Sequence, residues 1–265
     1  MKIYDFSTCL REGLLKDHDI ALAIGVFDGV HLGHRKIFTT LSDYRLTHPG
    51  CETCVITFAV NPKNINTPSL DTLSLRCSYI ESFFTDYTLV IDFSRDFSMI
   101  SGREFIHLLC TMCRVNAVIV GEDFRCGYAG NQITASEMSL AFESEGVSAD
   151  VMIIPPVLDA GRVRISSTRL RKLLAQGDIA AVNRLAGSAY RYDLTENVFV
   201  RQEGWYTSTA VTGQGLPGDG EYNAVLIFLN KSSEDCVLKV AGRKLFIRSS
   251  APLDRITADS IMILS

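Results

Sequence analysis

Short apolar runs alternate with helix-period segments over about the first 186 residues of the chain. Each run is nearly continuous in apolar residues, which is typical of strands buried on both faces of a sheet. The runs cover 20–25, 54–60, 87–93, 116–121 and 150–155. The intervening patterns predict helices at 32–47, 71–84, 102–113 and 134–145, followed by 167–176 and 178–187. This alternation predicts an α/β fold with a doubly wound parallel sheet and right-handed crossovers.

Local signals support three of the helix boundaries. Ser101 and Glu104 have the spacing of a capping box, in which each side chain satisfies the other's backbone N–H. Asp178 is a good N-cap for the last helix, and Gly187 is a good terminator for it.

Beyond residue 187 the pattern changes to short β-type segments separated by Gly, Asn, Asp, Ser and Pro. These segments cover 190–201, 204–213, 221–230, 236–242, 244–249 and 255–264. Such spacing predicts a small antiparallel, barrel-like β domain. We therefore expect two domains, at 1–187 and 188–265.

Composition narrows the class of protein. Of 265 residues, 47% are hydrophobic and 21% are charged, with a net charge of −4, as in ordinary globular proteins. The acidic balance argues against broad binding of nucleic acid or anionic membranes. No apolar run approaches the roughly 20 residues of a spanning helix, and the start has no signal-peptide pattern. We expect a cytoplasmic protein with no membrane or nucleic-acid partner; its oligomeric state is left open.

Two Cys-x-x-Cys pairs have the internal spacing of half a zinc site. They are Cys51 with Cys54 and Cys110 with Cys113. The two pairs are separated by more residues than in a compact zinc module, and each lies at the start of a predicted strand, where small thiols pack well. This placement favours reduced structural thiols in a cytoplasmic protein.

The stretch 25–34, GVFDGVHLGH, carries the strongest chemical signal. It follows a buried strand, so its glycines turn the chain at the carboxyl edge of the sheet, where such folds bind ligands. His31 and His34 are three residues apart at the start of a predicted helix, whose unpaired N–H groups suit an anion. Two other interpretations are a zinc site and a buried histidine pair. A zinc site would need a third protein ligand, which nothing nearby obviously supplies, and a buried pair would be satisfied by backbone carbonyls. The pattern favours a phosphate site.

GVFDGVHLGH resembles the nucleotidyltransferase signature of prokaryotic bifunctional riboflavin kinase/FAD synthetases. Three further stretches are similar to motifs of that family in the same order, and they read TFAVNP (57–62), VGEDFRCG (120–127) and RVRISSTRLRKLLAQGDI (162–179). The first departs from the family pattern, since Ala59 replaces an acidic residue and Val60 and Asn61 replace Pro and His. In the second, Cys126 replaces Phe. The resemblance covers about residues 15–187 and implies a Rossmann-like nucleotidyltransferase fold.

The resemblance also implies the reaction and its residues. AMP would pass from ATP to FMN, giving FAD and pyrophosphate, with Mg²⁺ neutralising charge. The implied catalytic residues are His31, His34 and Arg171, the last of which would hold the triphosphate tail. The implied ATP- and phosphate-binding residues are Gly25, Phe27, Asp28, Gly29, Arg164, Ser167 and Thr168. The implied flavin-binding residues are Phe58, Asn61, Asp123 and Phe124, and no protein ligand to a metal is assigned.

The family's second domain phosphorylates riboflavin through a Gly-rich segment and a Pro-Thr-Ala-Asn motif. This sequence has no Pro-Thr dipeptide, and only 216–228 resembles a hairpin of the kinase barrel. We therefore expect a degenerate barrel without riboflavin kinase activity. Two alternatives remain open: an adenylyltransferase with another phosphate acceptor, and a catalytically weak flavin- or nucleotide-binding regulatory protein.

Overall fold

The structure is a computed structural model, and it describes residues 1–60, 67–92, 95–211, 213–250, 253 and 258–265. The chain forms two compact units, each of which is made of three segments that are not contiguous in the sequence. Unit 1 comprises Met1–Phe27, Gly33–Ile65 and Cys77–Val157, and unit 2 comprises Asp28–Leu32, Asn66–Arg76 and Leu158–Ser265. The middle of the GVFDGVHLGH stretch thus belongs to unit 2, although both flanking segments belong to unit 1.

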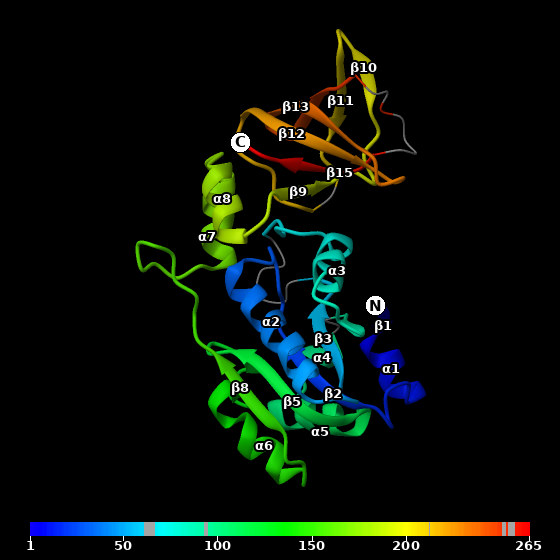
Figure 1. The fold of residues 1–265 in the computed structure, drawn as a ribbon, viewed down its shortest axis with the longest axis vertical. Coiled ribbons are helices and arrows are strands. Elements are labelled where there is room, and N and C mark those ends of the chain that lie inside the picture. Colours follow the sequence, from blue (N-terminus) through cyan, green and yellow to red (C-terminus); the bar gives the residue numbers. More distant parts are fainter. Residues whose placement is uncertain (61–66, 93–94, 212, 251–252, 254–257) are drawn as a thin grey trace. The chain divides into compact units, whose positions relative to one another are not determined.

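Unit 1 is built on a six-stranded parallel sheet in the order β1-β4-β3-β2-β5-β8 (Figure 1). Its strands are β1 (Lys2–Asp5), β2 (Asp19–Ile24), β3 (Glu52–Phe58), β4 (Tyr87–Ile91), β5 (Arg114–Gly121) and β8 (Asp150–Ile154). The predicted α/β fold with a doubly wound parallel sheet is confirmed. The central strands β2, β3 and β5 are almost entirely buried, which explains their continuous apolar runs.

Helices connect these strands, as the alternating pattern predicts. They are α1 (Phe6–Glu12), α2 (Leu32–Thr47), α3 (Leu73–Glu81), α4 (Arg95–Ser98), α5 (Gly102–Met112), the 3₁₀ turn η1 (Ala135–Glu137) and α6 (Met138–Ser144). The capping box at the start of α5 is confirmed, because Ser101 Oγ accepts from the N–H of Glu104 and Glu104 accepts from the N–H of Ser101. A two-stranded antiparallel ribbon, β6 (Arg125–Cys126) and β7 (Ile133–Thr134), follows β5.

The apolar pattern does not predict β1 or α1. Three of the four residues of β1 are exposed, and the strand lies at the edge of the sheet beside β4. An edge strand of this kind needs no continuous apolar run. The helix α1 is set locally, because Asp5 accepts from the N–H of Thr8 and Gly13 ends the helix in a left-handed conformation.

The order of strands reverses direction at β2. The chain runs from β2 outward through β3 and β4, and β5 then lies on the other side of β2. Such a switch leaves a crevice beyond the carboxyl ends of the two strands, which is where open α/β sheets bind ligands. The segments of unit 1 that leave β2 and β5 therefore begin at this crevice.

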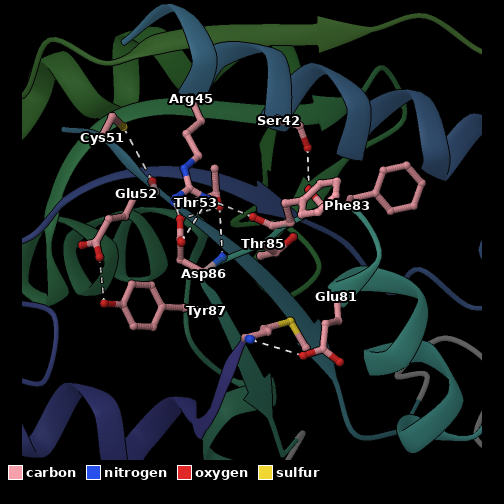
Figure 2. A network of polar contacts seen from close by, with 12 residues as sticks. Ser42, Arg45, Cys51, Glu52, Thr53, Glu81, Phe83, Thr85, Asp86 and Tyr87 are labelled. Carbon is pink, nitrogen blue, oxygen red and sulfur yellow. Dashed lines mark hydrogen bonds and ion pairs between the residues drawn. The ribbon is translucent and has the colours of Figure 1, made fainter. Parts of the chain in front are cut away.

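A polar network fixes the opposite, amino-terminal edge of the sheet (Figure 2). The carboxylate of Asp86 accepts from both the N–H and the hydroxyl of Thr53 at 2.9 Å, and it pairs with Arg45 at 3.0 Å. Ser42 donates to the carbonyl of Phe83 at 2.7 Å. These contacts join α2 to β3 and to the turn before β4, on the side of the sheet away from the switch-point loops.

The cysteine pairs lie near this amino-terminal edge. Cys51, Cys54 and Cys113 are buried, and Cys110 is partly buried. Burial raises the pKa of Cys113 to about 12 and that of Cys54 well above its usual value, so both are thiols at neutral pH. Within the described part of the chain, no three or more His, Cys, Asp or Glu side chains are grouped so that they could hold a metal ion.

Unit 2 contains α7 (Ser167–Ala175), α8 (Ile179–Ala186) and a seven-stranded antiparallel sheet (Figure 1). The sheet has the order β10-β11-β14-β13-β12-β15-β9. Its strands are β9 (Tyr190–Asp193), β10 (Val200–Gln202), β11 (Trp205–Thr209), β12 (Gly220–Phe228), β13 (Ser233–Ala241), β14 (Lys244–Arg248) and β15 (Ala258–Ile263). We call residues 188–265 the C-terminal β region; its antiparallel character is confirmed.

The caps predicted for the last helix are also confirmed. Asp178 accepts from the N–H of Ala181, and Gly187 ends α8 in a left-handed conformation. A domain boundary at residue 187 stays a prediction. None of the described helices combines the length and the apolar character needed to cross a membrane.

Candidate active site

The chain leaves β2 through a tight loop at the carboxyl edge of the parallel sheet. The N–H of Gly25 donates to the carbonyl of Ile56 at 3.1 Å, and the hydroxyl of Thr57 donates to the carbonyl of Val26 at 2.9 Å. Phe27 then adopts a left-handed conformation with φ +53°, which costs a non-glycine residue about 1–2 kcal/mol. Burial of the Phe27 side chain, which is 2% exposed, offsets this strain.

Gly25 and Phe27 form the packing that surrounds His34. A Cβ atom on Gly25 would lie 2.9 Å from the Phe27 ring, so only glycine lets the ring take this place. The ring stands perpendicular to the imidazole of His34, with centroids 5.3 Å apart, and it also packs on Phe38 at 4.7 Å. Such edge-to-face contacts fix the plane of an imidazole. Phosphate binding by Gly25 and Phe27 stays a prediction.

The two histidines lie at the start of α2. His34 is in the first turn of the helix and half-buried, whereas His31 lies one residue before the helix and is 6% exposed. The first N–H groups of a helix lack intrahelical partners, so this position suits an anion. His31 belongs to unit 2 and His34 to unit 1.

The predicted flavin residues lie at the ends of two strands that neighbour β2. Phe58 is the last residue of β3 and half-buried, and Asp123 and Phe124 follow β5. The N–H of Phe124 donates to the carbonyl of Gly121 at 2.9 Å, which closes a tight turn and leaves Asp123 exposed. Because β3, β2 and β5 are adjacent and parallel, these residues share one edge with Gly25. Asn61 lies outside the described residues.

Asp28 organises the part of the site that belongs to unit 2. Its side chain is 1% exposed, and its Oδ1 accepts from the N–H groups of Leu70 and Asp71 at 2.7 and 3.2 Å. Its Oδ2 forms an ion pair and hydrogen bond with Arg171. The backbone carbonyl of Asp28 accepts from Ser167 Oγ at 2.7 Å. The described contacts thus occupy both carboxylate oxygens, and phosphate binding by Asp28 stays a prediction.

Asp71 completes the arrangement from the other side. Its Oδ2 accepts from the N–H of Val30 at 3.1 Å, so the two segments exchange carboxylate-to-backbone hydrogen bonds. Burial and the neighbouring Asp28 raise the pKa of Asp71 to about 7, although Arg76 and the backbone N–H groups of Gly29 and Val30 oppose the shift.

Gly29 is required by this close approach. Its φ is +69°, and a Cβ atom there would lie 2.4 Å from Cδ1 of Leu70. Both the backbone conformation and the space therefore demand glycine. As with Asp28, a role of Gly29 in phosphate binding stays a prediction.

The predicted triphosphate residues lie around the start of α7. Ser166 caps the helix by accepting from the N–H of Arg169 at 3.3 Å, while Arg164 and Thr168 are exposed. Arg171 lies one turn into the helix and donates from Nε to the carbonyl of Pro68 at 3.2 Å, besides its pair with Asp28. Arg171 thus ties α7 to residues 28–31, which we call the histidine-bearing loop because they end at His31.

Two buried polar residues of this network have no recognisable signal in the sequence. Asp71 lies in the stretch SLDTLSL, where polar residues alternate with leucines, and Gln214 lies between two predicted strands. Both are at most 3% exposed. Polar residues in such surroundings are ordinarily exposed, so the sequence indicates neither their burial nor their hydrogen-bond partners.

The sequence profile of the FAD synthetase family matches residues 15–169. Three of the most similar relatives carry the name bifunctional riboflavin kinase/FMN adenylyltransferase. The protein of Buchnera aphidicola subsp. Schizaphis graminum is 30% identical over 80% of this chain and 70% of its own length. That of Escherichia coli (strain K12) is 29% identical over 71% and 58%, and that of Bacillus subtilis (strain 168) is 28% identical over 64% and 54%. The chain therefore matches little more than half the length of the last two.

A solved structure shares the fold. It is described as the crystal structure of a macrolide-efflux protein from Streptococcus pneumoniae, and it superposes with a TM-score of 0.77 over 92% of this chain and 83% of its own. Its sequence identity is 20%, so the likeness concerns the fold alone.

Proposed function

Because the chain belongs to the FAD synthetase family of nucleotidyltransferases, we propose that it transfers AMP from ATP to FMN, giving FAD and pyrophosphate, and that it lacks riboflavin kinase activity. One observation carries the proposal. The chain that leads from β2 through Gly25 and Phe27 to His34 in the first turn of α2 leaves the sheet beside the switch in strand order, at the edge that Phe58 and Asp123 share. Ligand binding at that edge is a general property of such sheets.

The proposed reaction is a direct displacement. A phosphate oxygen of FMN forms a new bond to the α-phosphorus of ATP, and the bond from that phosphorus to the oxygen bridging to the β-phosphorus breaks. Pyrophosphate leaves with the electron pair. No covalent intermediate with the protein is required, so the side chains orient two anions and neutralise developing charge.

The residues divide into two roles under this proposal. His31 and His34 donate hydrogen bonds to the reacting phosphates, and the packing of Phe27 holds the plane of His34. The triphosphate tail is held by Ser167, Thr168, Arg164 and Arg171. Guanidinium groups suit phosphate oxygens because two N–H groups can donate in parallel.

Mg²⁺ is proposed to arrive with ATP. The ion prefers carboxylate and phosphate oxygens, and it usually keeps only one or two protein ligands. Near the loop, both oxygens of Asp28 accept hydrogen bonds, and Asp71 is partly protonated at neutral pH. These carboxyl groups suit the stabilisation of the loop better than the binding of a metal, so the ATP phosphates and water would supply most oxygen ligands of the ion.

The absence of kinase activity is proposed for the C-terminal β region. Pro-Thr occurs nowhere in this sequence, and 216–228 alone resembles the kinase barrel. A kinase must position the γ-phosphate of ATP beside its acceptor, so the lack of this motif supports the proposal.

A second candidate is adenylyl transfer to another phosphate acceptor. It is favoured by the sequence after β3, where Val60 and Asn61 stand in place of the family's proline and histidine. Val60 is 55% exposed and so is available to contact a substrate.

Both candidates are tested by incubating the purified chain with Mg-ATP and one acceptor at a time: FMN, riboflavin, or a non-flavin phosphomonoester. The products are separated by chromatography, and pyrophosphate is measured in parallel. FAD and pyrophosphate from FMN, with no product from riboflavin, support the proposal. FMN formed from riboflavin contradicts the absence of kinase activity. Product from the phosphomonoester alone favours the second candidate, and binding of FMN and ATP without any product indicates a regulatory protein.

A further inference from the structure

The short segment 69–72 of unit 2 is hydrogen-bonded on two sides. On one side lies the histidine-bearing loop, in which Asp28 accepts from the N–H groups of Leu70 and Asp71 and the carboxylate of Asp71 accepts from the N–H of Val30. These three bonds hold the backbone immediately before His31. Because Asp28 and Asp71 are at most 3% exposed, water does not compete for these hydrogen bonds.

On its other side, the segment pairs with the C-terminal β region. The N–H of Ser69 donates to the carbonyl of Gly213 at 3.0 Å, and the N–H of Gly215 donates to the carbonyl of Ser69 at 2.8 Å. This is an isolated parallel bridge between Ser69 and Gln214. The loop between β11 and β12 thus continues into a strand-like contact with the segment that holds Asp28.

Gln214 locks this contact in place. It is 2% exposed, and its Nε2 donates to the carbonyls of Leu70 and Arg191 at 2.8 and 2.6 Å. Its Oε1 accepts from the N–H of Asp193 at 2.9 Å. A buried amide with all these partners joins β9 to segment 69–72, and replacing it would leave buried backbone groups without partners.

A second hydrogen bond joins the same elements. The hydroxyl of Thr72 donates to Oδ2 of Asp193 at 2.7 Å, and the other oxygen of Asp193 accepts from the N–H and hydroxyl of Thr195. Hydrogen bonds through Gln214 and Thr72 therefore connect β9 to segment 69–72, and those of Asp28 and Asp71 connect this segment to the backbone that carries His31.

We propose that the C-terminal β region holds the histidine-bearing loop in its working position through segment 69–72, with Gln214 and Asp71 as positioning residues. The inference rests on the proposed function for its effect on turnover, but not for its effect on the loop itself. It gives the C-terminal β region a role in adenylyl transfer without any reacting group of its own. Positioning of this kind matters because small displacements of a catalytic group reduce turnover strongly.

The test compares Gln214→Ala with Asn197→Ala in the full chain. Asn197 is a matched control, since it is 3% exposed, lies in the C-terminal β region, and its amide donates to Ser208 Oγ and to the carbonyl of Thr209. Those partners are separate from segment 69–72. Native-state hydrogen exchange is followed at the N–H groups of Val30, Leu70 and Asp71, together with kcat and KM for FMN and ATP.

In Gln214→Ala, we expect exchange at these three N–H groups to rise about tenfold or more, because local opening of the segment becomes easier. The value of kcat should fall about tenfold or more, with KM changed less, because FMN and ATP still bind while the loop is misplaced. In Asn197→Ala, the exchange rates of the three N–H groups and kcat should stay within about twofold of their values in the parent chain. This should hold even where the variant loses as much overall stability as Gln214→Ala.

Equal exchange in Gln214→Ala and the parent chain, or an equal rise in Asn197→Ala, would overturn the proposal. If the parent chain makes no FAD, the proposed function fails, but the exchange measurement still decides whether segment 69–72 transmits the effect. If Gln214→Ala does not fold, Thr72→Val removes only the Thr72 hydroxyl and its hydrogen bonds, and Thr72→Ser restores them. Rapid exchange in the valine variant with recovery in the serine variant supports the proposal, whereas no difference between the two contradicts it.

Discussion

Asp28 and Arg171 are 143 residues apart in the chain, and their side chains form an ion pair in which the carboxylate is 1% exposed and the guanidinium 15%. The pair links the histidine-bearing loop to α7. A buried carboxylate of this kind needs its partners, because an isolated charge out of water is very unfavourable. The stability of the loop and the position of α7 are therefore coupled.

Removing the cation should reveal this coupling. In Arg171→Met we expect a loss of about 3 kcal/mol in the free energy of unfolding, because the buried Asp28 side chain is left without its ionic partner. Arg169→Met is the matched control, since Arg169 is on the same helix and pairs with Asp159, but both side chains are more exposed. Its loss should be about 1 kcal/mol or less. Urea denaturation measures the free energy of unfolding of both variants. Equal losses would show that the ion pair of Asp28 contributes no more to stability than the more exposed pair.

The approach of segment 69–72 to the loop can be tested at Gly29. Gly29→Ala should lower the free energy of unfolding by about 3 kcal/mol or more. The new Cβ atom overlaps with Leu70, and alanine is also strained in the left-handed conformation of this residue. Gly204→Ala separates the two causes: Gly204 has a φ of +83°, but a Cβ atom there would meet nothing within 4 Å. Gly204→Ala should lower the free energy of unfolding by only about 1–2 kcal/mol. Similar losses in thermal or urea unfolding would mean that the close contact at Leu70 does not form.

The layout of the fold could be predicted because its signals are local. Buried strands such as β2 and β5 need continuous apolar runs. The capping residues Ser101, Asp178 and Gly187 mark where the helices α5 and α8 begin or end. These features depend on burial and on capping within a few residues. The edge strand β1 has neither and is not predicted.

The candidate site could be predicted only in part. The motif identifies Asp28 and Arg171, but no spacing rule indicates that they pair with each other. The contacts of Asp28 with 70–71 and of Gln214 with Leu70 join residues 42 to 144 positions apart, so they arise from tertiary folding. For that reason the sequence does not indicate the roles of Asp71 and Gln214.

Asp71 gives the stability a distinctive pH dependence. Its pKa is raised from 3.8 to about 7 in the folded chain, by burial and by Asp28, against the pull of Arg76 and the N–H groups of Gly29 and Val30. Between about pH 4 and pH 7 the folded state holds a proton that the unfolded state releases, so this group's contribution to stability falls as pH rises through that window.

Asp71→Asn removes this titration while preserving the shape of the side chain. The difference in unfolding free energy between the variant and the parent chain should therefore shift in favour of the variant as pH rises from 4 to 7, and then become constant. Urea denaturation at pH 5, 6, 7 and 8 follows the upper part of the change. A difference that is the same at every pH would contradict the raised pKa.

The histidines are predicted to act on the reacting phosphates. His31→Ala and His34→Ala should each lower kcat for FAD formation by roughly 10²–10³-fold, as expected for loss of a hydrogen-bond donor to a transition state. His107→Ala is the control, because His107 is 64% exposed and pairs with Glu145 at 2.8 Å. Its turnover should match that of the parent chain. Unchanged kcat in both loop variants would remove the histidines from the mechanism.

The most direct test of the central claim follows which phosphorus of ATP enters the flavin. The chain is incubated with FMN or riboflavin and with Mg-ATP labelled at either the α- or the γ-phosphorus. Adenylyl transfer without kinase activity predicts that FMN and α-labelled ATP give labelled FAD, that the γ-label appears only in pyrophosphate, and that riboflavin takes up neither label. Incorporation of the γ-label into riboflavin, or no transfer of the α-label to FMN, would contradict it.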